Sequence, residues 1–269
     1  LAAAAPGWRA HGQGGAWSHA ERWGQQRRSA WTDADKLLSF KVKAEGVNMN
    51  KLAGGILLRF DQGLETVLET MGARSVYNAV KAVNLVNRYI TKRRSHDTAG
   101  GPPHDGTSAD FFSGGDPGIA RIGFVPIFAR QGEQQWMKLR LVSLGDEPEQ
   151  PVPPADAEAI VLKVSGKADL RLLEKAILTN WTQRCLGSAA DPRLAAMGGE
   201  SAAAAVKASA FALRELKRRG SGVRTFLLCP RMEEVQGTTA RPGQPQTITF
   251  LDLELQPVGR GRPGHPDIR

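Results

Sequence analysis

The alternation of apolar and polar residues predicts one series of elements twice along the chain. The first series is a strand at 37–44, a helix at 50–60 behind an asparagine cap, a strand at 64–71, a helix at 72–94, and strands at 121–130 and 136–144. The second series is a strand at 159–166, a helix at 169–185, a strand at 193–197, a helix at 198–219, and strands at 223–230 and 246–255. The sequence therefore predicts an internal duplication of a βαβαββ unit.

Matching residues at one constant spacing support the duplication. Met71-Gly72 repeats as Met197-Gly198, Lys81 repeats as Lys207, and Arg88 repeats as Arg214, each 126 positions further on. Chance matches rarely keep one spacing along a whole helix. The sequence thus predicts a first domain at 37–144 and a second at 158–256.

Polar segments surround and interrupt the two predicted domains. Residues 95–120 are rich in Gly, Pro and Asp and predict a surface loop or insertion, and 145–157 predict an acidic, Pro-rich linker. Residues 257–269 form a basic tail. The extension at 1–36 contains four of the six tryptophans, at positions 8, 17, 23 and 31. Two interpretations stay open for these tryptophans: they dock on a partner, or they pack on the chain's own domains.

Composition narrows the class of partner. The chain has 269 residues and a formal net charge of +9, which favours a polyanion, with nucleic acid first and an anionic membrane surface second. The sequence contains no run of about 18 apolar residues, so no segment is predicted to span a membrane. Cys185 and Cys229 lack the spacing of a zinc site, and Cys229 is expected to be a buried apolar residue. The first residue is Leu1, which is compatible with a processed organellar protein.

The two long helices are predicted to be amphipathic with a basic stripe. Lys81, Arg88 and Lys92 fall on one arc of the first, opposite an apolar face. Lys207, Arg214 and Arg218 fall on the same arc of the second. A solvated surface helix shows the same pattern, and Lys92-Arg93-Arg94 and Lys217-Arg218-Arg219 also suit a helix C-terminus. Recurrence in both copies, together with the net charge, favours the functional interpretation.

No catalytic constellation emerges from the sequence. The five histidines lie in segments predicted as loops or extensions, and no nucleophile elbow, zinc-binding helix or dinucleotide-binding loop is present. The glycines at 72 and 198–199 precede helices and could place backbone N–H groups around a phosphate, although close packing explains them equally well. We therefore expect neither enzyme activity nor a cofactor or metal.

Several of these segments resemble a known family. "KVKAEG", "NKLAGGILLRF", "TMGARSVYNAVKAV", "IGFVPIF" and "MKLRLV" in the first copy resemble the stage V sporulation protein S family of the Alba-like superfamily. The second copy is similar but more diverged, in "LKVSGKAD", "AAMGGESAAAAVKASA", "FLLCP" and "ITFLDLEL". The resemblance implies two tandem Alba-like α/β sandwich domains, each a four-stranded mixed sheet covered by two helices. Alba-like domains pair into dimers, which leads to the hypothesis that the two copies pair within this chain.

The resemblance also implies a nucleic-acid surface on the first loop, the helices and the last hairpin of each copy. The matching positions, with the basic stripes, are Lys43, Lys51, Lys81, Arg88, Lys92, Arg93, Arg94 and Arg130 in the first copy, and Lys163, Lys167, Lys207, Arg214, Arg218 and Arg241 in the second. Glu45, Glu200, Glu233 and Glu234 depart from this pattern. Three of these four acids lie in the second copy, which leaves it open as a protein-binding or packing copy.

These observations predict a non-enzymatic RNA-binding protein, an accessory subunit of a mitochondrial ribosome, with ribosomal RNA and neighbouring ribosomal proteins as partners. A plastid is the alternative location. A DNA-binding nucleoid protein is the first rival, and salt dependence and competition by duplex DNA separate the two. The second rival is a structural subunit of another organellar complex that has lost nucleic-acid binding.

Overall fold

The computed structural model describes residues 39–98, 119–131, 134–145, 160–187, 191–220, 225–237 and 246–258. The first half contains β1 (Ser39–Val42), α2 (Met49–Asp61), β2 (Val67–Thr70), α3 (Ala73–Thr98), β3 (Arg121–Gln131) and β4 (Gln134–Leu144). The second contains β5 (Val161–Val164), α4 (Leu170–Cys185), β6 (Arg193–Met197), α5 (Gly199–Arg219), β7 (Phe226–Gly237) and β8 (Gln246–Pro257). The element order of the first half thus repeats in the second.

The long helices α3 and α5 begin in the same way. Gly72 and Gly198 both have φ of 83°, a left-handed conformation that favours glycine, and each turns the chain from a strand into a helix. The hydroxyl of Ser75 donates to the carbonyls of Met71 and Gly72, and the hydroxyl of Ser201 donates to those of Met197 and Gly198. The recurring Met-Gly-x-x-Ser motif therefore encodes this strand-to-helix turn.

The described strands join in one mixed sheet with the order β1-β2-β4-β3-β7-β8-β6-β5. β1 and β2 are parallel, as are β5 and β6, while the hairpin strands pair antiparallel. The registers match as well: Leu68 pairs with Leu139 as Leu194 pairs with Leu253. The halves therefore repeat in strand pairing as well as in element order.

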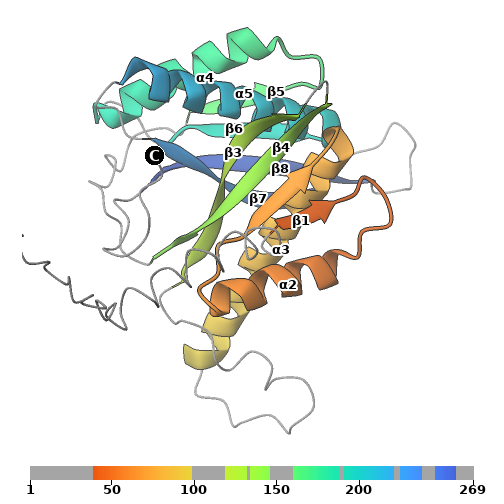
Figure 1. Cartoon of the computed structure of the whole chain (residues 1–269). Coiled ribbons are helices and arrows are strands. Elements are labelled where there is room, and N and C mark those ends of the chain that lie inside the picture. Colours follow the sequence, from red (N-terminus) through yellow and green to blue (C-terminus); the bar gives the residue numbers. More distant parts are fainter. Residues whose placement is uncertain are drawn as a thin grey trace, which may run out of the picture. The chain divides into compact units, whose positions relative to one another are not determined.

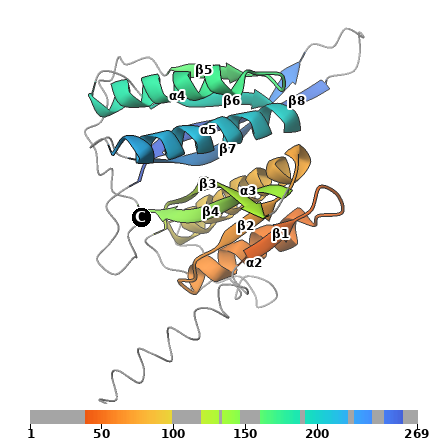
Figure 2. The ribbon, with the colours of Figure 1, turned by 45° about the horizontal axis from the view of Figure 1, so that its top comes forward.

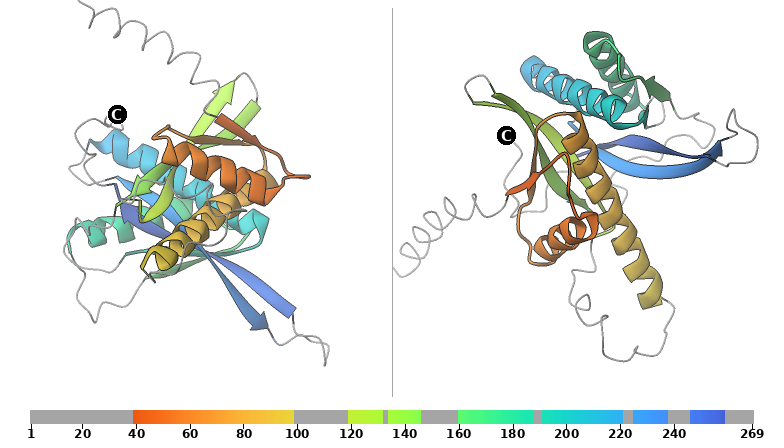
Figure 3. Two further views of the ribbon diagram at one scale, coloured as in Figure 1. Left: turned by 90° about the horizontal axis from the view of Figure 1, so that it is seen from below. Right: turned by 90° about the vertical axis from the view of Figure 1, so that its right-hand side faces the viewer.

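The two halves meet at β3 and β7 through a single antiparallel pair, Phe124 with Leu228. These residues are equivalent, since Phe124 pairs with Leu141 on β4 and Leu228 with Leu255 on β8. The two hairpins cross at this point and then diverge (Figure 1; Figure 3). Because this antiparallel contact joins equivalent positions, the two halves are related by an approximate two-fold axis.

Gly123 makes this crossing possible. A Cβ atom at this position would lie 2.3 Å from Cδ1 of Leu227 and 3.1 Å from the carbonyl oxygen of Leu228. Leu227 and Cys229 are almost completely buried, at 0% and 1% exposure. A glycine inside a strand commonly marks such a close approach.

The helices pack against the sheet and against one another. α2 contacts α3, α4 contacts α5, and α3 contacts α5 across the junction of the halves (Figure 2). The ring of Phe211 on α5 stacks on Phe128 of β3, with centroids 4.8 Å apart, so α5 packs on the hairpin of the other half. Buried residues of both halves form one hydrophobic core.

The predicted class, helices packed on a mixed β-sheet, is confirmed for the described residues. Three details differ from the sequence prediction. The two four-stranded sheets join edge to edge, α3 continues to Thr98 so that His96 lies in a helix, and β7 continues through Glu233 and Glu234, which were predicted in a turn. The last difference arises because the outer half of β7, "RMEEVQG", is mostly polar and lacks the alternation of apolar residues from which strands are predicted. The tryptophan extension, the linker and the basic tail lie outside the described residues.

Candidate nucleic-acid interface

The loop after β1 packs on the start of α3. Nδ2 of Asn78 donates to the carbonyl oxygens of Lys43 and Ala44, at 3.1 and 3.0 Å. Arg74 and Glu45 form an exposed ion pair, 3.1 Å between Nη1 and Oε1. Asn78 thereby fixes the backbone of the loop that carries Lys43 beside the helix that carries Lys81.

The loop after β5 makes the equivalent approach to α5. A Cβ atom at Gly166 would lie 2.8 Å from Cβ of Glu200, so glycine permits the loop to pack closely on the first turn of α5. Lys167, the next residue, is exposed. Lys43 and Lys167 therefore lie in loops beside the starts of the two long helices.

The starts of α3 and α5 also contact each other. A Cβ atom at Gly199 would lie 3.8 Å from Cβ of Tyr77, an ordinary van der Waals distance, so the two helix starts pack closely across the junction of the halves. We call the surface made by residues 43–46, 73–81, 165–168 and 199–207 the junction surface. Its basic residues are Lys43, Arg74, Lys81, Lys167 and Lys207, and its acidic residues are Glu45 and Glu200. The surface therefore carries a net positive charge.

Tyr77 is a partly exposed aromatic residue on this surface. Nζ of Lys81, one helical turn away, lies 4.8 Å from the centroid of the Tyr77 ring, a cation–π distance. Partial burial raises the pKa of Tyr77, so the phenol stays neutral at physiological pH. Sequence reasoning missed Tyr77, although its position four residues before Lys81 is a usable signal for an aromatic–cation pair on one helix face.

Arg93 and Arg218, which the sequence predicts to bind nucleic acid, form ion pairs with described carboxylates. Arg93 makes two hydrogen bonds to the carboxylate of Asp61 on α2, both 3.1 Å, and these side chains are 21% and 15% exposed. Arg218 makes two hydrogen bonds to Glu215 at 2.8 Å, and Arg219 bonds the same carboxylate. These hydrogen bonds lower the pKa of Glu215 to about 2. Arg93 and Arg218 therefore have their charge compensated within the fold.

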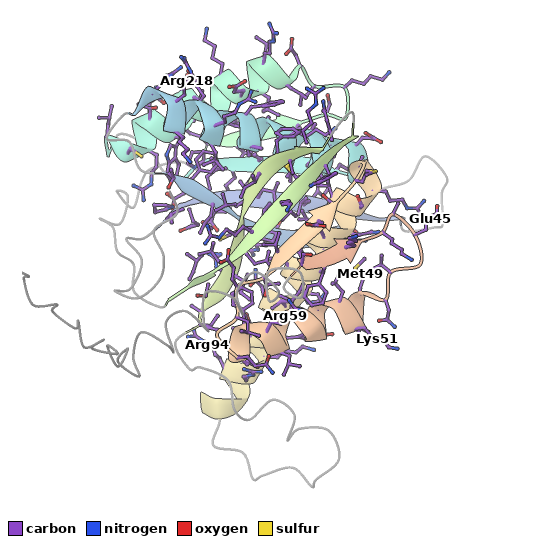
Figure 4. All side chains as sticks on the ribbon, viewed as in Figure 1. Glu45, Met49, Lys51, Arg59, Arg94 and Arg218 are labelled. Carbon is purple, nitrogen blue, oxygen red and sulfur yellow. The ribbon has the colours of Figure 1, made fainter. Side chains whose placement is uncertain are left out.

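The other predicted residues are spread over several elements. Arg88 and Lys92 are exposed along α3, Lys51 is exposed on α2, and Arg214 lies 5.2 Å from the ring of Phe211 on α5. Arg94 is half-buried near the end of α3, far from Arg218 at the end of α5 (Figure 4).

Two further predicted residues lie away from the junction surface, and a third lies outside the described residues. Arg130 is exposed near the tip of the first hairpin. Lys163 is exposed beside the buried Val164, so it points to the sheet face away from the helices. Arg241 is outside the described residues. The structure thus places Lys43, Lys81, Lys167 and Lys207 within the junction surface and the other described residues of the set outside it.

The sheet face away from the helices is largely neutralised by ion pairs. Three ion pairs connect neighbouring strands or their ends, namely Lys138–Glu69, Arg140–Glu65 and Arg193–Asp252, and a fourth, Arg121–Glu254, connects β3 with β8, between which β7 lies. The last joins the two halves. Burial raises the pKa of the Asp252 carboxyl. A surface whose cations are paired in this way is a weaker attractor of polyanions than the junction surface.

The described residues contain no group of three or more His, Cys, Asp or Glu side chains that could bind a metal ion. An open groove of about 550 Å³ between α4 and α5 is lined by both signs of charge, including Arg171, Lys175 and Glu215. Cys229 is buried as predicted, and burial raises its pKa to about 12, which makes it a poor nucleophile. No helix in the described ranges is both long and apolar enough to cross a membrane.

Comparison with protein-family models and with curated proteins found no match to this chain. The resemblance to the stage V sporulation protein S family therefore rests on the motifs named above.

Proposed function

We propose that this chain is a non-enzymatic RNA-binding protein of tandem Alba-like architecture, and that RNA binds at the junction surface. The observation that supports this proposal most directly is that the contacts of Asn78, Gly166 and Gly199 join two basic loops and two helix starts into one surface. Five cations against two carboxylates there suit a phosphate backbone. A role as an accessory subunit of a mitochondrial or plastid ribosome belongs to the same proposal.

The test measures binding of the full chain to RNA over a range of salt concentrations. Lys81→Ala/Lys207→Ala removes one cation from each half of the junction surface. If these lysines contact phosphates, the double variant weakens binding at least ten-fold at low salt and reduces the slope of log K against log salt by about one to two.

A matched control is available on the other sheet face. Lys41 and Lys163 are both exposed, and each lies beside a buried valine of an edge strand that points to the core. Lys41→Ala/Lys163→Ala removes the same charge and is expected to leave affinity and salt slope unchanged. Equal losses in both double variants would show a diffuse electrostatic effect and contradict the proposed site.

One observation favours a rival function, a structural subunit without nucleic acid. Arg93 and Arg218 are compensated by Asp61 and Glu215, and Glu45 and Glu200 lie on the junction surface itself. Absence of binding to both RNA and duplex DNA at 50 mM salt would support that rival. Binding of duplex DNA as tightly as RNA would instead support a nucleoid protein.

A further inference from the structure

We propose that the junction surface selects single-stranded RNA, with one base stacked on Tyr77 and the adjoining phosphate on Lys81. This inference rests on the proposed function and names the form of nucleic acid that the surface takes. Four observations around Tyr77 support it.

The first is the pairing of an aromatic ring with a cation, both of which are half-exposed. Nζ of Lys81 is 4.8 Å from the Tyr77 ring centroid, so a base stacked on this ring would place its phosphate within reach of the ammonium group. Single strands are generally bound by this combination of stacking platforms and nearby cations. Bases in an A-form duplex are already stacked and do not offer a free face.

The second is the small residue opposite Tyr77. Gly199 of the other half approaches Tyr77 with no side chain, at the 3.8 Å Cβ spacing. Any larger residue at 199 would place its side chain in contact with Tyr77, whereas glycine places none there.

The third observation concerns the hydrogen bonding of the Tyr77 hydroxyl. No hydrogen bond of the Tyr77 hydroxyl to another described residue is present, whereas the hydroxyl of Tyr89, further along the same helix, donates to Oδ1 of Asn50 at 3.1 Å. Tyr89 has a packing role between α2 and α3. The Tyr77 hydroxyl has no such role, so no hydrogen bond to another described residue fixes this ring.

The fourth is asymmetry between the halves. The position equivalent to Tyr77 in α5, 126 residues further on, is Ala203, which is 2% exposed. The approximate two-fold relation would otherwise create two identical stacking positions. A single aromatic at the junction gives the surface one stacking position and hence a defined placement of the strand.

The experiment compares a labelled 12-nucleotide single-stranded RNA with a duplex of the same sequence, using the full chain. We expect the single strand to bind at least five-fold more tightly. Tyr77→Leu keeps an apolar side chain of similar size and removes the aromatic face, so it should weaken single-strand binding about ten-fold. Duplex binding, which depends on the lysines alone, should change less than two-fold.

Two control variants make the result specific. Tyr77→Phe keeps the ring and is expected to bind within two-fold of the parent chain, with thermal melting used to verify that each variant is folded. Tyr89→Leu makes the same change at the only other tyrosine of the sequence and should leave RNA affinity unaltered. Equal affinity for duplex and single strand, or an unchanged affinity in Tyr77→Leu, would overturn the inference while leaving RNA binding intact. Loss of all RNA binding in the parent chain would instead refute the proposed function.

Discussion

At the scale of single residues, polar side chains complete backbone hydrogen bonding where the sheet is interrupted. β3 pairs with β7 at only one position, so the neighbouring Ile122 has a backbone edge without a strand partner there. The amide of Asn87 on α3 supplies both missing bonds: Ile122 N donates to Oδ1 at 2.7 Å, and Nδ2 donates to the Ile122 carbonyl at 2.9 Å. Asn87 is 8% exposed. The Asn87 side chain thus makes the two backbone hydrogen bonds that a neighbouring strand would otherwise make.

Asn87→Leu should be strongly destabilising. It leaves a buried N–H and a buried carbonyl of Ile122 unpaired, which costs roughly 2 to 4 kcal/mol of unfolding free energy. Urea denaturation followed by circular dichroism measures this loss. Asn180→Leu is the control, because Asn180 bonds only the Ala176 carbonyl of its own helix, and a change below about 0.5 kcal/mol is expected there. Similar stability of Asn87→Leu and the parent chain would show that water satisfies Ile122.

At the scale of elements, the sequence predicted the order and type of the described helices and strands but not every ion pair between them. Periodicity and the Met-Gly-x-x-Ser repeat located α3 and α5, because these features are local. The partner of Arg93 was not predictable by the same reasoning, whereas Glu215 lies three residues before Arg218 on the same helix and is a local signal. Asp61 is 32 residues from Arg93 and becomes its neighbour only when α2 packs on α3. A basic stripe on a helical wheel therefore does not distinguish cations that form ion pairs within the fold from cations that stay exposed.

Arg93 and Arg88 are expected to separate these two roles on α3. Arg93→Ala breaks a half-buried bidentate ion pair between α3 and α2 and should lower the unfolding free energy by about 1 to 2 kcal/mol, without change in RNA affinity. Arg88 is exposed, so Arg88→Ala should leave stability within about 0.5 kcal/mol and weaken RNA binding if the strand extends along α3. Denaturation and binding measured on both variants test this. The reverse pattern would show that Arg93, rather than Arg88, faces the ligand.

At the scale of the whole molecule, the two halves have diverged into complementary partners. Gly123 of β3 accommodates the Leu227 side chain of β7, and Arg121 pairs with Glu254 at 3.1 Å across the junction. The equivalent of Gly123 in the second half is Leu227 itself, as the pairing of Phe124 with Leu228 shows. The sequence showed Gly123 only as a glycine inside a strand. Its partner lies more than a hundred residues away, beyond the reach of local pattern analysis.

Gly123→Ala tests whether the halves depend on each other. Its methyl group would meet Leu227 Cδ1 at 2.3 Å and the Leu228 carbonyl at 3.1 Å, so β7 must shift at a cost of about 1 to 3 kcal/mol. Because the core is continuous across the junction, we expect the parent chain to unfold in one calorimetric transition and the variant to unfold in one transition at a lower temperature. Hydrogen exchange should then show equal loss of protection in α2 and α4, which lie in different halves. Two separate transitions in the parent chain, or loss confined to one half in the variant, would contradict a shared core.

Since the proposed RNA surface needs the contact of Gly199 with Tyr77 across the same junction, Gly123→Ala should also weaken RNA binding, although it lies in β3 and outside that surface.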